Sequence, residues 1–436
     1  MSLPRSILLG WALLLPTCLA AQEWTLDACL EYALLHNDEL MVNKQKQETG
    51  DFQKKAAVSA LLPEIDFSAA LDHYWKIPVQ VFPGELIGEP EGSFVPVRMG
   101  MPWMGNIGAN ANWNLIDPSA WEDIKLATLQ AQAAEEDVVA VKKLLIRNVT
   151  MAYFQALHQN LLLELDTDRL SAHTESHRLM GRLLEEGQID QISFNVSKSL
   201  LNELEDTRQQ SRKSLDLALV DLKFWMGYPL TEPLGLDPHQ ELPDMAMVLT
   251  FSREDLPDYT RHLLEMQISR QQYKSIRSQY MPRLSLNGSF QKVGFGESLN
   301  FISNTGWFDV GFVGIGLRLP LLSMQKTLYR PQQYRSAMRA AELEFEHQMQ
   351  ENERRFMKAK LSLESALSTW KSEEQNLKLA MENEKLSRLK LEKGRADLFE
   401  YRQIQQDFSL ARQKAGDARL AYWQQLIELD YLQNLP

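Results

Sequence analysis

The chain has 436 residues, of which 44% are hydrophobic and 24% are charged. This composition is typical of folded proteins and excludes a wholly disordered chain. Beyond the N-terminal region no run of 18 uncharged apolar residues occurs, which excludes a helical membrane span in the mature protein. With 46 Lys and Arg against 58 Asp and Glu, the formal net charge is -12, so the chain is poorly suited to bind nucleic acid.

Residues 1–21 have the features of a secretory signal peptide. A single early cation, Arg5, precedes an apolar run over 7–15, and small residues surround the expected cleavage position. The residues before Cys18 faintly resemble a lipoprotein cleavage box, so lipidation of this cysteine is the alternative. If Cys18 is removed with the signal peptide, Cys29 is the only cysteine left and no disulfide forms within the chain.

The rest of the chain is predicted to contain two copies of one structural plan. The stretch that begins at Asp38 aligns without gaps with the stretch that begins at Pro257, and this alignment places Pro63 on Pro282. A proline-rich linker over 229–243 separates the two copies, because its prolines cannot continue a helix. The internal similarity therefore indicates a duplication.

Each copy is predicted to contain a helix, two strands, a very long helix, a turn and a further helix. The first repeat covers 22–235 and the second covers 236–436, and their last long helices end near 228 and 433. Alternation of apolar and polar residues predicts two strands in each repeat. These four strands lie at about 64–75, 106–116, 283–293 and 308–320. In the last strand the alternation changes parity, which we interpret as a β-bulge near Gly311 or Gly314.

Two stretches almost free of Pro and Gly, 119–186 and 332–393, predict very long helices. Apolar residues recur in both with the spacing of a heptad seam, which indicates coiled-coil packing. The seam positions are Ala127, Ala131, Ala134, Val138, Val141 and Leu145 in the first helix, and Leu363, Ala366, Trp370, Leu377 and Met381 in the second.

Each very long helix is followed by a sharp turn. Gly187 and Gly394 are suited to the left-handed conformation that ends a helix, and Asp190 and Asp397 follow three residues later, where each is placed to cap the next helix. The sequence therefore predicts two helical hairpin tips.

The four strands allow two interpretations. A soluble β-sandwich would show the same alternation. Strands of about ten residues with aromatic ends are also typical of a membrane β-barrel, and the long helices between them favour this interpretation. Because lipid does not tolerate an open sheet edge, a barrel with only four strands per chain must be completed by other chains.

In the order, duplication and spacing of these features, the mature chain resembles the TolC family of outer-membrane efflux and secretion channels. The resemblance is carried by TLDACLEYALLHNDEL from Thr25, by ALLPEIDF around Pro63 and its twin QYMPRLSL around Pro282, by the junctions WNLIDP and LPLLS, and by the paired tips. It implies an α plus transmembrane β fold, in which a homotrimer forms a 12-stranded β-barrel with four strands per chain. A long periplasmic α-helical barrel continues from it.

The resemblance also implies a location and partners. The barrel would lie in outer-membrane lipid and the helical tunnel in the periplasm. The chain would conduct substrates passively, as the outer-membrane component of a tripartite efflux pump or a type I secretion system. Its partners would be a periplasmic adaptor, also called a membrane fusion protein, and an inner-membrane transporter. The alternative is a periplasmic coiled-coil scaffold or adaptor without a channel, which leaves the four strands unexplained.

The second tip is where the family places acidic residues around a closed aperture. Glu400 matches this position best, and Asp397 is a weaker candidate. Arg402 departs from the family pattern and is a candidate ion-pair partner of Glu400. The residues at which the adaptor is expected to dock are Gly187, Asp190, Gly394 and Asp397.

Catalytic motifs are missing from the sequence, which has no Walker loop, GxSxG elbow, HExxH helix or paired CxxC. We therefore expect no enzymatic activity and no cofactor. His173 and His177 lie four residues apart on a predicted helix, a spacing that suits a shared metal ion. Because no third ligand is apparent, we favour a solvated helix face and predict no metal site.

Overall fold

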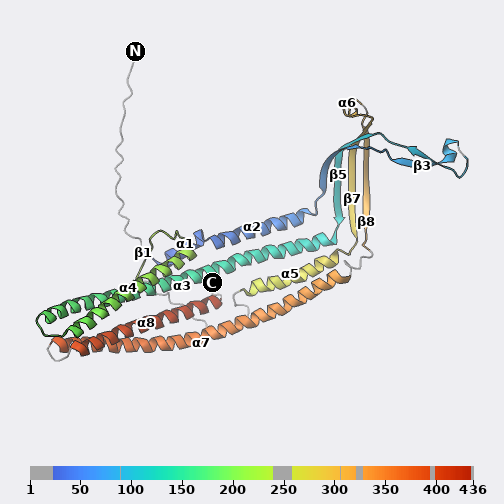
Figure 1. Ribbon diagram of the computed structural model, residues 1–436. Helices are drawn as coiled ribbons and strands as arrows, with labels where there is room; N and C mark the ends of the chain where they lie inside the picture. The colour runs from blue at the N-terminus through green and yellow to red at the C-terminus, as the bar shows by residue number, and fades with distance from the viewer. Residues whose placement is uncertain are drawn as a thin grey trace, which may run out of the picture. The chain divides into compact units, whose positions relative to one another are not determined.

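The computed structural model describes residues 23–88, 90–238, 258–304, 306–320, 328–392 and 398–433 (Figure 1). The chain divides into two compact units, each assembled from segments far apart in the sequence. The first unit consists of Met1–Val42, Val139–Pro257 and Glu351–Pro436, and the second consists of Asn43–Val138 and Asp258–Gln350. Both units therefore combine segments of the two predicted repeats, whose boundaries remain a prediction.

The second unit contains a four-stranded antiparallel sheet with the strand order β2-β5-β7-β8. Its strands are β2 (Glu64–His73), β5 (Trp103–Ile116), β7 (Arg283–Gly296) and β8 (Phe308–Arg318). Figure 1 shows β5, β7 and β8 side by side. In the central pair Trp113 lies opposite Leu286, so the sheet joins strands from the two halves of the chain.

The prediction of a β-bulge in the last strand is wrong. β7 and β8 pair without a register shift from Arg283, opposite Arg318, to Val293, opposite Phe308. The parity change is instead accommodated by placing the apolar residues at the start of β8 on the polar face of the sheet. There the ring centroids of Phe295 and Phe308 lie 6.5 Å apart, a cross-strand aromatic contact that stabilises this arrangement. The sheet has a register shift elsewhere, in the β5–β7 pair between 114 and 116.

A second hairpin, not predicted from the sequence, lies between β2 and β5. It consists of β3 (Val79–Pro83), the short helix η1 (Gly84–Ile87) and β4 (Phe94–Arg98). Figure 1 shows this hairpin projecting from the end of the sheet near the short helix α6 (Phe301–Asn304).

The two very long helices predicted from the sequence are present. They are α3 (Pro118–Glu185), with 68 residues, and α7 (Arg330–Glu392), with 63 residues. Each runs through both compact units. In the second unit α3 is accompanied by part of α2 (Asp38–Ser59) and α7 by α5 (Tyr259–Ser278).

The junction between the sheet and α3 is fixed by one buried carboxylate. Asp117 follows β5 and accepts hydrogen bonds from the backbone N–H of Ser119 at 3.0 Å and from the Ser119 hydroxyl at 2.7 Å. The guanidinium of Arg283, at the start of β7, lies 3.3 Å from the same carboxylate. The helix therefore begins at a defined point relative to the two central strands.

The first unit contains α1 (Leu26–His36), α4 (Gln191–Met226) and α8 (Leu398–Leu432) together with the remaining parts of α3 and α7. Its N-terminal strand β1 (Glu23–Trp24) pairs in parallel with β6 (Gly235–Leu236). Residues Phe356, Ala359 and Leu363 of α7 pack against Leu426, Leu429 and Leu432 of α8 to form a buried apolar cluster. No helix in the described part of the chain is long and apolar enough to cross a membrane.

Candidate functional site: an open sheet and the helical tips

One face of the four-stranded sheet is exposed and largely apolar, apart from an ion pair between Lys292 and Asp309 at 3.2 Å. The pairing register places on this face five large side chains that are each 70% to 80% exposed. They are Ile65 and Phe67 of β2 and Val313, Ile315 and Leu317 of β8. An exposed apolar surface of this kind marks a contact with another protein or with lipid.

The opposite face is polar and hydrogen-bonded across three strands. The carboxamide oxygen of Asn110 on β5 accepts hydrogen bonds from the Ser289 hydroxyl at 2.8 Å and from the Gln291 amide at 3.1 Å, both on β7. Its amide nitrogen donates to the hydroxyl of Ser68 on β2 at 3.4 Å. Uncharged side chains therefore offer hydrogen bonds to water along this face.

The sheet has two open edges among the described residues, because β2 and β8 each pair with one neighbour only. All three pairings are antiparallel, so β2 and β8 run in opposite directions. Successive copies of the chain can thus join β8 to β2 in the antiparallel orientation that the rest of the sheet uses.

The first helical tip has the geometry predicted from the sequence. Gly187 has a φ of 70°, and its N–H donates to the carbonyl of Leu184 at 3.0 Å. The N–H of Gln188 donates to the carbonyl of Leu183 at 2.8 Å, which completes a Schellman motif. Asp190 then caps α4 by accepting a hydrogen bond from the backbone N–H of Ser193 at 2.9 Å.

The electrostatics of this tip follow from the cap. Asp190 accepts hydrogen bonds from the side chain and from the backbone N–H of Ser193. These bonds hold the pKa of its carboxyl group below the ordinary value. The carboxylate is therefore charged near neutral pH, at the N-terminus of α4, where the helix dipole favours a negative charge.

The second tip is described only in part. Gly394 and Asp397 lie outside the described residues, as does the side chain of Arg402, so the predicted pairing of Arg402 with Glu400 stays a prediction. Glu400 lies in the first turn of α8 and is exposed.

A polar network, not predicted from the sequence, connects α8 to α7 beside this tip. The Tyr401 hydroxyl lies 3.3 Å from the Glu384 carboxylate, which also accepts a hydrogen bond from Arg388 at 2.8 Å. Gln405 donates to the Tyr401 hydroxyl at 2.9 Å. The contacts with Tyr401 and Glu384 raise the pKa of Arg388. The first turn of α8 is thus attached to the last turns of α7.

Of His173 and His177 near the first tip, His177 contacts α4. The Nδ1 atom of His177 lies 3.0 Å from the hydroxyl of Ser197 on α4, and its ring stacks on Phe194 with 4.7 Å between centroids. Within the described ranges, no three His, Cys, Asp or Glu side chains are grouped so that they could hold a metal ion. His177 therefore contributes to the packing of α3 on α4.

An antiparallel seam between α3 and α8 links the two halves of the chain in the first unit. Arg147 donates to Glu428 at 2.6 Å, and His158 lies 2.9 Å from Asp417. Between these polar pairs the rings of Phe154 and Trp423 pack with 4.6 Å between centroids. We name this set of contacts the α3–α8 seam.

Comparison with known proteins agrees with these features. Residues 29–228 match the family described as outer membrane efflux protein. No individual curated protein sequence matches the chain.

Among solved structures, the chain is similar to three outer-membrane proteins. The CmeC outer membrane channel of Campylobacter jejuni has a TM-score of 0.77 at 14% identity, over 94% of this chain and 85% of that one. VceC of Vibrio cholerae has a TM-score of 0.75 at 16% identity, over 94% and 96%. The open-state MtrE channel of Neisseria gonorrhoeae has a TM-score of 0.74 at 16% identity, over 94% and 88%.

The similarity to solved structures shows that the chain shares the fold of these outer-membrane proteins. The family match supports the same relationship from the sequence. The scaffold or adaptor alternative is therefore not favoured, and the resemblance to the TolC family is confirmed. Residues 29–228 match the outer membrane efflux protein family, and the fold of the chain is that of outer-membrane channels with a periplasmic helical tunnel.

Proposed function

We propose that three copies of this chain close a 12-stranded barrel, and that substrates pass through it from an inner-membrane transporter and a periplasmic adaptor to the exterior. The observation that carries the proposal is the four-stranded sheet, which exposes one apolar face and has two open edges. Transport through the chain is passive, and the transporter supplies the energy.

The open edges require more than one copy. Unpaired backbone groups at a sheet edge are not tolerated in the hydrocarbon core, so a membrane sheet must close on itself. The smallest membrane barrels have about eight strands, which already needs two copies of a four-stranded chain. The family resemblance favours three copies.

The two faces of the sheet fit the two environments of such a barrel. The face with Ile65 and Val313 is apolar and suits the lipid, whereas the face with Asn110 and Gln291 suits a water-filled lumen. The glycine at 314, on the polar face, leaves open space toward the lumen.

We propose that the adaptor docks on the helical tips at Gly187, Asp190, Gly394 and Asp397. The support for this comes from the first tip, where a tight turn presents a charged carboxylate on the surface. We further propose that Glu400 lines the aperture, with Asp397 and Arg402 beside it. Glu400 is exposed in the first turn of α8, as this role requires.

Cell fractionation followed by native mass determination of the detergent-extracted protein tests the proposed assembly. We expect the protein in the outer-membrane fraction, at about three times the mass of the mature chain. A species of two copies would contradict the trimer, and a soluble periplasmic monomer would contradict the barrel.

An export assay tests the docking role of the first tip. Gly187→Pro removes the N–H that bonds to Leu184, so we expect it to abolish export while trimers still form. Gly187→Asn is the matched control, because Asn tolerates the left-handed conformation, and we expect it to retain export. Normal export by the Pro variant would contradict the proposed docking site.

A further inference from the structure

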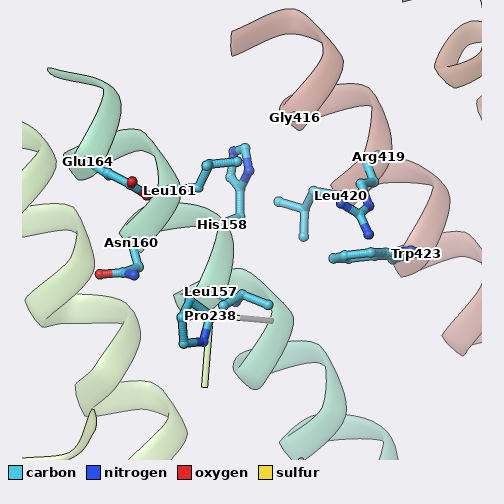
Figure 2. Close-up of a pocket in the computed structure, with 10 residues that line it drawn as sticks. All are labelled: Leu157, His158, Asn160, Leu161, Glu164, Pro238, Gly416, Arg419, Leu420 and Trp423. Carbon is cyan, nitrogen blue, oxygen red and sulfur yellow. The ribbon is translucent and has the colours of Figure 1, made fainter. Parts of the chain in front are cut away.

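Two features of the described structure have no part in the proposed transport of substrates. The first is a cavity of about 290 Å³ between α3 and α8, lined by one cationic side chain, Arg419, and one anionic side chain, Glu164 (Figure 2). Its lining therefore favours neither charge of ligand. The second is a glycine-lined hollow in the apolar face of the four-stranded sheet, and aromatic rings of the chain itself occupy this hollow.

The hollow lies at the end of the sheet farthest from the helices, beside α6 (Figure 1). Gly105 of β5 lies directly opposite Gly294 of β7, and Gly296 follows two residues later on β7. The pairing register places all three glycines on the same face as Ile107 and Phe290. Because three side chains are missing here, the apolar face has room for a further segment of the chain.

Two rings from the connection between β7 and β8 fill the hollow. A Cβ atom built on Gly105 would lie 3.0 Å from the ring of Trp307, and one built on Gly294 would lie 3.0 Å from the ring of Phe301. A Cβ atom built on Gly296 would overlap Cβ of Phe301. Phe301, in α6, is only 3% exposed, and its ring centroid lies 6.0 Å from that of Trp307. The hollow therefore holds α6 against the apolar face.

An ion pair shows the level of this hollow relative to a bilayer. Lys292, two residues before Gly294 on the same face, lies 3.2 Å from the carboxylate of Asp309. A charge on the lipid-facing side of a barrel is costly at the bilayer midplane and is tolerated near the head groups. The stretch of β7 from Leu284 to Lys292 is about 27 Å long and, at the usual strand tilt, about 20 Å high, close to the roughly 25 Å apolar band of a membrane barrel. The ion pair therefore fits the outer boundary of the hydrocarbon, and the hollow fits the head-group level.

Apolar side chains are exposed around the hollow. Leu299 is 49% exposed, and Ile302, next to the buried Phe301, is 52% exposed. The hollow lies on the two central strands, away from the open edges of β2 and β8 at which a second copy joins. Since these side chains continue the apolar face of the sheet, the surface fits lipid better than a neighbouring copy.

We propose that α6 and Trp307 anchor the channel in the outer leaflet of the outer membrane. Acyl chains contact Leu299 and Ile302, and Trp307 lies at the boundary with the head groups, where tryptophan is enriched in membrane proteins. This inference rests on the proposed barrel, which assigns the apolar face to lipid. It adds the depth at which the barrel lies and a role for the connection between β7 and β8.

Fluorescence quenching of the protein reconstituted in liposomes tests the anchor. An NBD label is attached to a single introduced cysteine, in Ile302→Cys on α6, Val313→Cys on the apolar face or Gly314→Cys on the polar face. Cys29 is buried and stays unlabelled. The quenchers are aqueous iodide and phosphatidylcholines brominated near the glycerol end or near the methyl end of the acyl chains. We expect the strongest quenching at 302 by bromine near the glycerol end, at 313 by bromine near the methyl end, and at 314 by iodide.

The possible outcomes separate the anchor from the barrel. Lipid quenching at 313 together with iodide quenching alone at 302 would overturn the anchor and leave the barrel intact. Strongest quenching at 302 by bromine near the methyl end would overturn the depth inferred from the ion pair. No lipid quenching at 313 would overturn the assignment of the apolar face to lipid, and the anchor with it.

A glycine substitution tests whether the hollow holds the anchor. In Gly296→Ala the added methyl group overlaps Phe301, so α6 must move, and we expect the label at 302 to lose lipid quenching while the label at 313 keeps it. Gly288→Ala is the matched control on the same strand and face, because the nearest atom to its Cβ is 3.8 Å away, and we expect it to change neither label. Equal lipid quenching at 302 in the two variants would overturn anchoring through Phe301.

Discussion

Two adjacent residues of β8 provide a direct test of which sheet face contacts lipid. Val313 lies at the middle of the strand, on the apolar face, and its side chain is 80% exposed. Gly314 lies on the polar face opposite Asn287, and nothing lies within 4 Å of a Cβ atom built on it. We compare Val313→Arg with Gly314→Arg, which add the same side chain to opposite faces.

The expected difference between the two variants is large. An Arg that faces lipid near the bilayer midplane costs roughly 2–4 kcal/mol per copy, and therefore roughly 6–12 kcal/mol in a trimer. An Arg at 314 has open space and points into water, so we expect a change within about 0.5 kcal/mol, as for an ordinary surface substitution.

Urea unfolding of the protein reconstituted in liposomes, followed by tryptophan fluorescence, measures this difference. We expect a strongly lowered midpoint for Val313→Arg and little change for Gly314→Arg. Equal losses, or a greater loss for Gly314→Arg, would refute the assignment of the apolar face to lipid.

Three further predictions concern the helical part of the chain. Gly187→Ala and Gly227→Ala both place a methyl group on a left-handed residue, with φ of 70° and 69°, at a cost of roughly 1–2 kcal/mol. At Gly227 the added Cβ would also lie 2.4 Å from the His36 carbonyl oxygen, so we expect a further loss of roughly 1–3 kcal/mol in denaturant unfolding; equal losses would argue against this contact. Glu400→Ala is expected to raise single-channel conductance in planar bilayers and to weaken block by cations, and unchanged traces would show that this carboxylate does not line the aperture. Because the pKa of His158 is lowered in the folded protein, its imidazole takes up a proton at a higher pH in the unfolded chain than in the folded one. The free energy of unfolding should therefore fall as the pH drops below 6.5. His158→Gln should flatten that slope, whereas an identical slope would contradict the prediction.

The strands of the large sheet could be predicted because their two faces have different environments. Ile65 and Phe67 alternate with polar residues, and this pattern is visible without any knowledge of the partner strand. The β3–β4 hairpin has no such contrast, because Val81 and Val95 lie on different faces and are both apolar. Pro83 and Pro96 lie within its strands, and a proline in the sequence argues against a strand.

The helical tips could be predicted for a different reason. The left-handed turn at Gly187 and the cap at Asp190 depend on residues within a few positions of each other, so the local sequence determines them. The α3–α8 seam joins Arg147 to Glu428, which are 281 residues apart, and a single sequence does not indicate such a pair. Nothing in the local sequence indicates that the Tyr401 hydroxyl bonds to Glu384 of α7, 17 residues earlier in the chain.

The pairing of β5 with β7 has a consequence for how the channel is made. Asn110 and Ser289, which are hydrogen-bonded in the sheet, lie 179 residues apart, so the β5 edge finds its partner only after the second half of the chain has been exported. Until then β2 and β5 form a two-stranded ribbon with exposed apolar side chains and open edges, a form that is marginally stable and prone to aggregate in water. The order of the strands along the chain thus delays completion of the sheet until β7 and β8 are available to pair.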